Sequence, residues 1–114
     1  GNPVSCAVGE AAVRYLLEHD LIGNAARVGN YLAAQLEDLA TRQPAIAEVR
    51  GVGMLRGLAF TQPIGHQVYN AARQRGLLTR PGGDWVGVAP PLCTTPDEAD
   101  EIVAILDASI LDTV

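Results

Sequence analysis

The sequence predicts an α+β domain, in which about four helices pack with a small, mainly antiparallel sheet of about four strands in the order ααββαββα. Three observations support this fold class. Apolar residues recur at helical spacing near both ends of the chain. Runs in the middle of the chain that are bounded by glycine and proline have strand character. A length of 114 residues suits one domain with a single modest core. We therefore treat residues 1–114 as one domain.

The first helix is predicted to open at Asn2-Pro3, because asparagine caps free N–H groups and proline suits the first helical position. The segment that follows is rich in small residues, which permit close backbone approach. Its apolar stripe consists of Val4, Val8, Tyr15 and Leu16. We expect this helix, within residues 1–20, to pack tightly against a larger partner.

The second helix is predicted to follow Asp20 and to end before Pro44. Apolar residues recur along it at spacings of three or four, which gives one buried face. This face consists of Leu21, Ala25, Val28, Leu32, Leu36 and Leu39.

Strand character begins after Pro44, with predicted strands at 46–50 and 54–60. They are joined by the glycine corner 51–53, where we expect a bend or bulge. The spacing GxGxxxG does not indicate a dinucleotide loop, because these glycines precede a strand and do not open a helix. Arg50 and Arg56 flank the corner and are expected to be structural, bonding backbone carbonyls or another domain.

A turn at 62–65 leads to a short helix through Val68, Ala71 and Ala72, which Gly76 is expected to stop in a left-handed conformation. The chain then returns in a hairpin.

The hairpin is predicted from strands at 77–80 and 84–89 around the turn Pro81-Gly82-Gly83. Residues 89–92 are extended, since each proline keeps its predecessor out of the helical region. Trp85 is expected in the core, with pocket lining as the alternative.

The last helix carries the strongest local signal, a capping box at Thr95 and Glu98 with proline between them. Its first turns are acidic, which favours a solvated face matched to the helix dipole over a metal site. The acidic residues are Asp97, Glu98, Asp100 and Glu101, and the buried stripe consists of Ala99, Ile102, Val103, Leu106 and Ile110.

The charge balance excludes several function classes. All 8 basic residues are arginines, so the chain cannot form a lysine Schiff base, a Walker-type phosphate loop or a lysine general base. A net charge of −5 argues against binding to nucleic acid or to anionic membranes. No apolar run is long enough to span a membrane and no signal peptide begins the chain, so we expect a cytoplasmic protein whose beginning has been removed.

The cysteines and histidines form no metal motif. Cys6 and Cys93 lie far apart in the sequence, and we expect two buried or half-buried free thiols in preference to a disulfide. His19 and His66 are expected on helix surfaces. We therefore expect no metal site.

Several motifs occur together in register. They are GNPVSCA at 1–7, VRGVGM at 49–54 leading to Gly57, GLLTRP at 76–81, and VAPPL at 88–92 before TPDE at 95–98. Together they resemble the C-terminal part of class III (subgroup II, fold type I) pyridoxal-phosphate-dependent aminotransferases, and the resemblance covers essentially the whole chain.

The resemblance implies that this chain is the small domain of a longer enzyme, whose large domain holds pyridoxal 5'-phosphate and the catalytic lysine. It also explains the missing lysine, which in that family precedes the motif at Gly1. The implied reaction moves an amino group from an ω-amino acid, amine or diamine to a 2-oxo acid. The large domain and these substrates are the implied partners, and the chain alone is expected to be inactive and to bind no cofactor.

The resemblance also implies site residues. Arg80 matches an arginine that swings toward the substrate carboxylate in relatives of ω-amino acid:pyruvate transaminases, and its guanidinium suits bidentate binding. The alternative is an ion pair with Asp84. Gly87 stands where ornithine- and acetylornithine-type members carry arginine, which makes those donors less expected. Gly1 and Asn2 match positions near the cofactor phosphate.

Two alternatives remain at this stage. One is a free-standing interaction or regulatory module that keeps the small-domain fold, and the other is a racemase or aminomutase of the same fold. Because the first helix would normally lie against the large domain, its apolar face is exposed or covered by another copy in the isolated chain, so we expect a homo-oligomer in solution.

Overall fold

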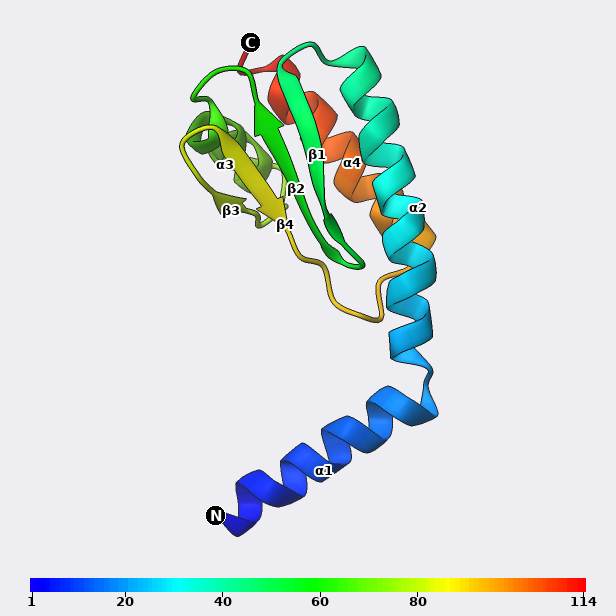
Figure 1. The fold of residues 1–114 in the computed structure, drawn as a ribbon. Helices are drawn as coiled ribbons and strands as arrows, with labels where there is room; N and C mark the ends of the chain where they lie inside the picture. The colour runs from blue at the N-terminus through cyan, green and yellow to red at the C-terminus, as the bar shows by residue number, and fades with distance from the viewer.

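The computed structural model describes residues 1–114 and contains four helices and a four-stranded sheet (Figure 1). The helices are α1 (Pro3–Glu18), α2 (Leu21–Arg42), α3 (Gly65–Gln74) and α4 (Pro96–Leu111). The strands are β1 (Ile46–Val52), β2 (Leu55–Phe60), β3 (Arg80–Pro81) and β4 (Trp85–Val88). The class and the element order are those predicted.

The sheet has the strand order β1-β2-β4-β3, and every neighbouring pair is antiparallel. The two hairpins therefore join through β2 and β4. Along β1 and β2, Val49 lies opposite Leu58, and along β2 and β4, Leu58 lies opposite Val86. Leu58 and Val86 are completely buried, so this row faces the helices.

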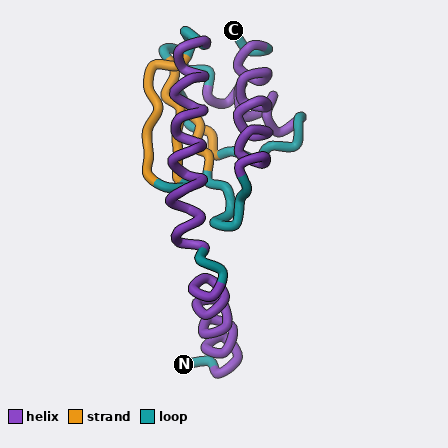
Figure 2. Tube along the Cα trace, turned by 90° about the vertical axis from the view of Figure 1, so that its right-hand side faces the viewer, coloured by secondary structure: helices purple, strands orange, loops and turns teal.

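Helices cover only one face of the sheet. In the view of Figure 2 the strands lie on the left and α4 on the right. α2 packs on β1 and α4, while α3 packs on α4 and β4. The core between these layers is aliphatic, with one aromatic residue. It consists of Val28, Leu32, Leu36, Leu39, Ile46, Met54, Leu58, Phe60, Val68, Val86, Val88, Ala99, Val103, Leu106 and Ile110.

The helix signals of the sequence are confirmed for α2, α3 and α4. The predicted stripes of α2 and α4 supply most of the core. At the start of α4, Thr95 Oγ1 accepts a hydrogen bond from the Glu98 amide at 3.3 Å, and Glu98 Oε2 accepts one from the Thr95 amide at 2.8 Å. After α3, Gly76 takes a left-handed φ of 89°.

α1 projects away from the other elements (Figure 1), and the whole molecule measures 50 × 27 × 21 Å. Asn2 caps it as predicted, because its Oδ1 accepts a hydrogen bond from the Val4 amide at 2.9 Å. None of its residues is buried. The chain turns into α2 at Asp20, which has a left-handed φ of 49°. No helix is both long and apolar enough to cross a membrane.

The predicted strand limits differ from the observed ones. β1 continues through Val52, so the turn lies at Gly53 and Met54, and the one register shift of this hairpin lies between Ile46 and Glu48. β3 contains only Arg80 and Pro81, although a strand over 77–80 was expected. The ladder with β4 ends at the pair Arg80–Gly87, so residues 77–79 form no strand.

Two expectations about burial are wrong. Trp85 is 39% exposed, because strand alternation turns its neighbour Val86 into the core and leaves the indole on the opposite face. Cys6 and Cys93 are free as expected, but both are exposed. Cys6 lies on the projecting α1, and Cys93 lies in the loop before α4.

Candidate functional site

A row of two arginines and two glycines crosses the open face of the sheet. Arg50 lies opposite Gly57, Gly57 opposite Gly87, and Gly87 opposite Arg80. Residues directly opposite each other in antiparallel strands project from the same face. The row therefore has an arginine on each edge strand and no side chain between them.

A shallow hollow of about 490 Å³ opens over this row. Its lining includes Arg50, Leu55, Gly57, Arg80, Trp85 and Gly87. No aspartate or glutamate contributes to the lining. A hollow with arginines and an aromatic ring in its wall and no acid suits a small anion that has an apolar body.

Arg80 is the free cation of this hollow. Its guanidinium makes no ion pair within the chain, so the alternative partner Asp84 does not engage it. A guanidinium offers five N–H donors in a planar fork that matches a carboxylate. The geometry thus leaves Arg80 available for an anionic ligand.

Trp85 forms the apolar wall beside Arg80. A Cβ added at Gly82 would overlap the indole, and a Cβ at Gly87 would lie 3.3 Å from the ring atom Cζ3. The indole therefore lies along the hairpin backbone, over positions without side chains. The sequence did not assign Trp85 to the site, although its alternation with the apolar residues Val86 and Val88 places it on the Arg80 face.

Thr79 adds an unsatisfied polar group next to Arg80. Its Oγ1 is buried and has no hydrogen-bond partner, and Thr79 lines the same hollow. A buried hydroxyl without a partner costs about 1–3 kcal/mol.

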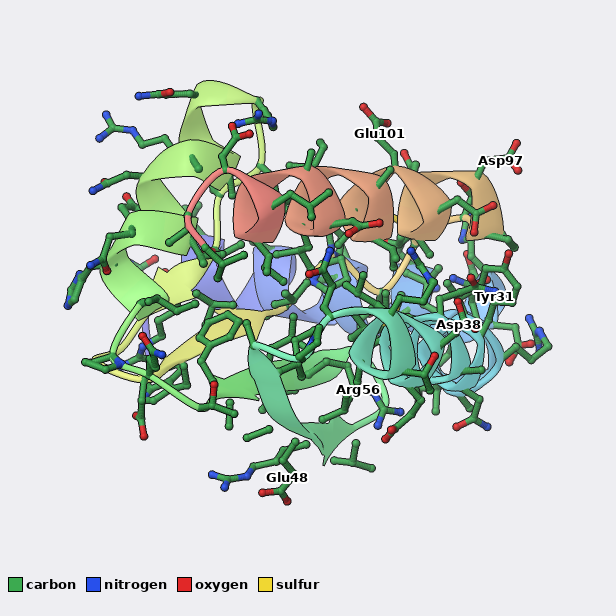
Figure 3. All side chains as sticks on the ribbon, turned by 90° about the horizontal axis from the view of Figure 1, so that it is seen from above. Tyr31, Asp38, Glu48, Arg56, Asp97 and Glu101 are labelled. Atoms are coloured by element: carbon green, nitrogen blue, oxygen red, sulfur yellow. The ribbon has the colours of Figure 1, made fainter.

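Arg50, at the other end of the row, forms an ion pair with Glu48 and does not bond a backbone carbonyl. Its Nη2 lies 2.6 Å from Glu48 Oε2. Figure 3 shows Glu48 projecting from the sheet on the side opposite α4. The hydrogen bond lowers the pKa of Glu48 below its ordinary value and raises the pKa of Arg50. Both groups are therefore charged at neutral pH.

Arg56 is structural, as predicted. It donates hydrogen bonds to the carbonyl oxygens of Gly53 at 2.9 Å, Gly51 at 2.8 Å and Gly29 at 3.1 Å. The first two belong to its own hairpin and the third belongs to α2. Arg56 thus ties the β1–β2 hairpin to α2 through three of its five N–H donors.

Gly1 and Asn2 are not brought near the hollow. Both lie at the exposed start of α1, distant from the sheet in both views (Figures 1 and 2). None of the four hollows on the surface includes them, and the Asn2 side chain is engaged in capping. Their assignment to the cofactor phosphate stays a prediction that needs a further domain.

The acidic residues of α4 have separate roles and do not form a metal-binding cluster. Glu98 caps the helix, and Asp100 accepts a hydrogen bond from the Tyr31 hydroxyl at 2.7 Å, which raises the pKa of Tyr31. Asp97 and Glu101 project outward (Figure 3). No three histidine, cysteine, aspartate or glutamate residues come close enough to hold a metal ion.

Both histidines are exposed: His66 lies on the surface of α3 as expected, whereas His19 caps the C-terminal end of α1. The ring of His19 stacks on Tyr15 with 3.9 Å between centroids, and both residues are exposed. His66 is exposed on α3.

Without a lysine, the chain also offers no side-chain amine that could hold an aldehyde cofactor covalently. A complete site for such a cofactor therefore does not fit within these residues.

Comparisons with known proteins identify relatives along the whole chain. The family model "Aminotransferase class-III" matches residues 1–110. An uncharacterised aminotransferase of Sinorhizobium fredii, y4uB, is 39% identical over 96% of the chain and 27% of its own length. The acetylornithine aminotransferase of Mycolicibacterium smegmatis is 36% identical over 99% of the chain and 28% of its own length.

A solved structure from the directed evolution of transaminases by ancestral reconstruction superposes with a TM-score of 0.93. It is 38% identical, and the match covers 99% of this chain and 28% of that one. The chain thus spans little more than a quarter of the relatives it matches. Sequence, fold and family model agree, and the chain belongs to the class III family of pyridoxal-phosphate-dependent aminotransferases.

Proposed function

We propose that the chain is the C-terminal small domain of an aminotransferase that moves an amino group from an ω-amino acid, amine or diamine to a 2-oxo acid. The family match, the short coverage of the relatives and the absence of lysine support this proposal. Pyridoxal phosphate, held by a large domain, supplies the electron sink when bound. The isolated chain is inactive, because it has no lysine to hold that cofactor.

In this proposal residues 1–20 dock on the large domain. Support comes from α1, which buries none of its residues and exposes apolar ones: Val4 is 72% and Val8 63% exposed. A helix of 16 residues without tertiary contacts is only marginally stable in water. A large domain that covers α1 would hold it in place and bring Gly1 and Asn2 to the cofactor phosphate.

The role proposed for Arg80 is to bind the substrate carboxylate. The observation that carries this role is the unpaired guanidinium beside Trp85, next to the side-chain-free positions Gly57 and Gly87. A carboxylate can accept two parallel hydrogen bonds from the guanidinium while the carbon chain lies against the indole. Because position 87 is glycine and not arginine, Arg80 is the one free arginine at this site. This favours amino donors other than ornithine or acetylornithine.

The test is the variant Arg80→Ala in the longer gene product that contains this sequence joined to its cofactor-binding domain. Loss of a bidentate contact should raise KM for a carboxylate-bearing substrate about 10- to 100-fold. KM for a plain amine, measured in its own half-reaction, should stay within about twofold. Arg73→Ala is the matched control, because Arg73 is an exposed arginine on α3 outside the hollow.

An equal rise of KM for both substrates would contradict the role of Arg80. Arg80→Lys should keep part of the affinity for the carboxylate substrate, because lysine retains the positive charge but not the planar guanidinium group.

The sequence upstream of Gly1 in the gene tests the domain assignment separately. A start codon directly before Gly1 would support a free-standing module.

A further inference from the structure

The junction between α1 and α2 contains the one non-glycine residue with a left-handed backbone. α1 ends at Glu18 and α2 begins at Leu21, so only His19 and Asp20 separate the two helices. Asp20 has a φ of 49° and a ψ of 43°, a conformation that residues with a Cβ rarely adopt. Its side chain makes no capping hydrogen bond to the start of α2, so helix capping does not explain this conformation.

The carboxylate of Asp20 is held against α2 by two residues of that helix. A Cβ added at Gly23 would overlap the Asp20 carboxylate, so the carboxylate occupies space that any other residue at position 23 would fill. One turn farther along, Arg27 Nη1 lies 3.2 Å from Asp20 Oδ2. Glycine at position 23 and arginine at position 27 therefore fix the side chain of Asp20, and through it the left-handed backbone.

The start of α2 is fixed to the core, so a change at the junction moves α1 alone. Asn24 Nδ2 donates hydrogen bonds to the carbonyl oxygens of Leu92 at 2.7 Å and Thr94 at 3.0 Å, which ties the first turn of α2 to the loop before α4. α1 has no such tie, since none of its residues is buried and it packs substantially only on α2. The angle of α1 therefore depends on the backbone of His19 and Asp20.

The contacts of Asp20 are weak enough to be released. Both side chains of the pair with Arg27 are more than half exposed, and exposed ion pairs contribute little net stability. The left-handed backbone of Asp20 opposes the bend. A continuous helix would also pair the first N–H groups of α2, which have no partner within that helix. The bent arrangement and a straight one are therefore close in free energy.

We propose that Asp20, Gly23 and Arg27 form a latch that holds α1 at its observed angle to α2. Figure 1 shows that α1 bends from the axis of α2 toward the side on which the strands lie. When the carboxylate leaves Gly23 and Arg27, Asp20 returns to the right-handed region and the helices join into one helix over residues 3–42. In the longer enzyme of the proposed function, this latch sets the orientation of the core, which carries Arg80, relative to the surface that covers α1.

The chain carries its own labelling sites for the test, because Cys6 on α1 and Cys93 in the loop before α4 are free and exposed. Spin labels on both cysteines report the distance between α1 and the core by double electron–electron resonance. The labelled chain is diluted into excess unlabelled chain, so that distances between copies do not contribute. The unsubstituted chain should give one narrow distance distribution. Asp20→Ala disfavours the left-handed backbone and removes the carboxylate, so it should shift most of the distribution to a longer distance.

Two further variants separate the latch from a backbone preference alone. Arg27→Gln removes the ion pair and Gly23→Ala fills the space of the carboxylate, so each should shift part of the distribution to the same longer distance. The matched controls are Arg14→Gln, which removes an exposed ion pair with Glu10 inside α1, and Gly9→Ala, where a Cβ meets nothing within 4 Å. Neither control should move the distance.

A broad distribution in the unsubstituted chain would overturn the latch, because α1 would then have no fixed angle. An unchanged distance in Asp20→Ala would overturn it as well. If Asp20→Ala shifts the distance but Arg27→Gln and Gly23→Ala do not, the bend follows from residue 20 alone and the latch is wrong. Asp20→Gly gives an independent check, since glycine adopts the left-handed backbone freely but has no carboxylate. Its distribution should broaden around the observed distance, and a distribution as narrow as that of the unsubstituted chain would contradict the latch.

Discussion

Three arginines near the sheet have the same charge, but their partners give them different roles. Arg56 is bound to three carbonyl oxygens, Arg50 shares its charge with Glu48, and Arg80 is free. Their spacing in the sequence does not distinguish them. Only the strand register shows that Arg50 and Arg80 share a face while Arg56 points toward α2.

The structural role of Arg56 gives a stability prediction. Arg56→Met keeps the aliphatic stem but leaves three carbonyl oxygens without their charged donor, so the free energy of unfolding should fall by about 2–3 kcal/mol. Urea denaturation followed by circular dichroism measures this. Arg73→Met, the control at an exposed arginine whose side chain makes no ion pair or hydrogen bond in the structure, should change the free energy of unfolding by less than about 0.5 kcal/mol. Similar losses in both variants would contradict the role of Arg56.

The candidate site was predicted only in part. Arg80 was identified through its motif, because that motif is contiguous in the sequence. Pocket lining by Trp85 was given only as the alternative to a core position. The glycine row was missed, because it depends on strand pairings such as Gly57 with Gly87, 30 positions apart. Such pairings follow from turn position, and the turn at Gly53 and Met54 was itself placed one to two residues too early.

At the scale of elements, the helices were predictable because their signals are local. Periodicity and the capping box act within one or two turns, and they placed α2 and α4 correctly. Strand ends depend on neighbours that are distant in sequence. β3 has two residues because its ladder with β4 ends at the pair Arg80–Gly87, a limit that neither strand shows alone.

The contact of α2 with the β1–β2 hairpin depends on one helical glycine. A Cβ at Gly29 would lie 2.5 Å from the carbonyl carbon and oxygen of Gly53, both backbone atoms. Gly29→Ala should therefore force the hairpin away from α2 and disturb the Arg56 contacts. We expect the free energy of unfolding to fall by about 2–4 kcal/mol, measured by urea denaturation.

Gly9→Ala is the matched control for this prediction, since Gly9 is also helical but a Cβ there meets nothing within 4 Å. Alanine favours helix over glycine by up to about 1 kcal/mol. Because α1 has no tertiary contacts of its own with the core, this change should raise helical content without moving the urea midpoint. A stabilised Gly29→Ala variant would show that the hairpin does not sit this close to α2.

At the scale of the whole molecule, the core and the site both lie within residues 21–114. α1 adds length to the molecule but no buried side chain, and its substantial contacts are with α2 only. The chain spans 27% of the length of the relative y4uB, and under the proposed function a large domain would cover α1. In isolation the helix must stay exposed, fray or find a second copy.

We predict the third outcome, association of the isolated chain into dimers or larger oligomers through α1. Val4 and Val8 lie four positions apart on one side of the helix and are largely exposed, so pairing two copies removes apolar surface from water. Light scattering should give a mass that rises with concentration above 12.0 kDa. The double variant Val4→Gln and Val8→Gln should lower it, whereas Glu10→Gln with Arg14→Gln, on another side of α1, should not. A 12.0 kDa monomer at high concentration would show that α1 remains exposed without self-association.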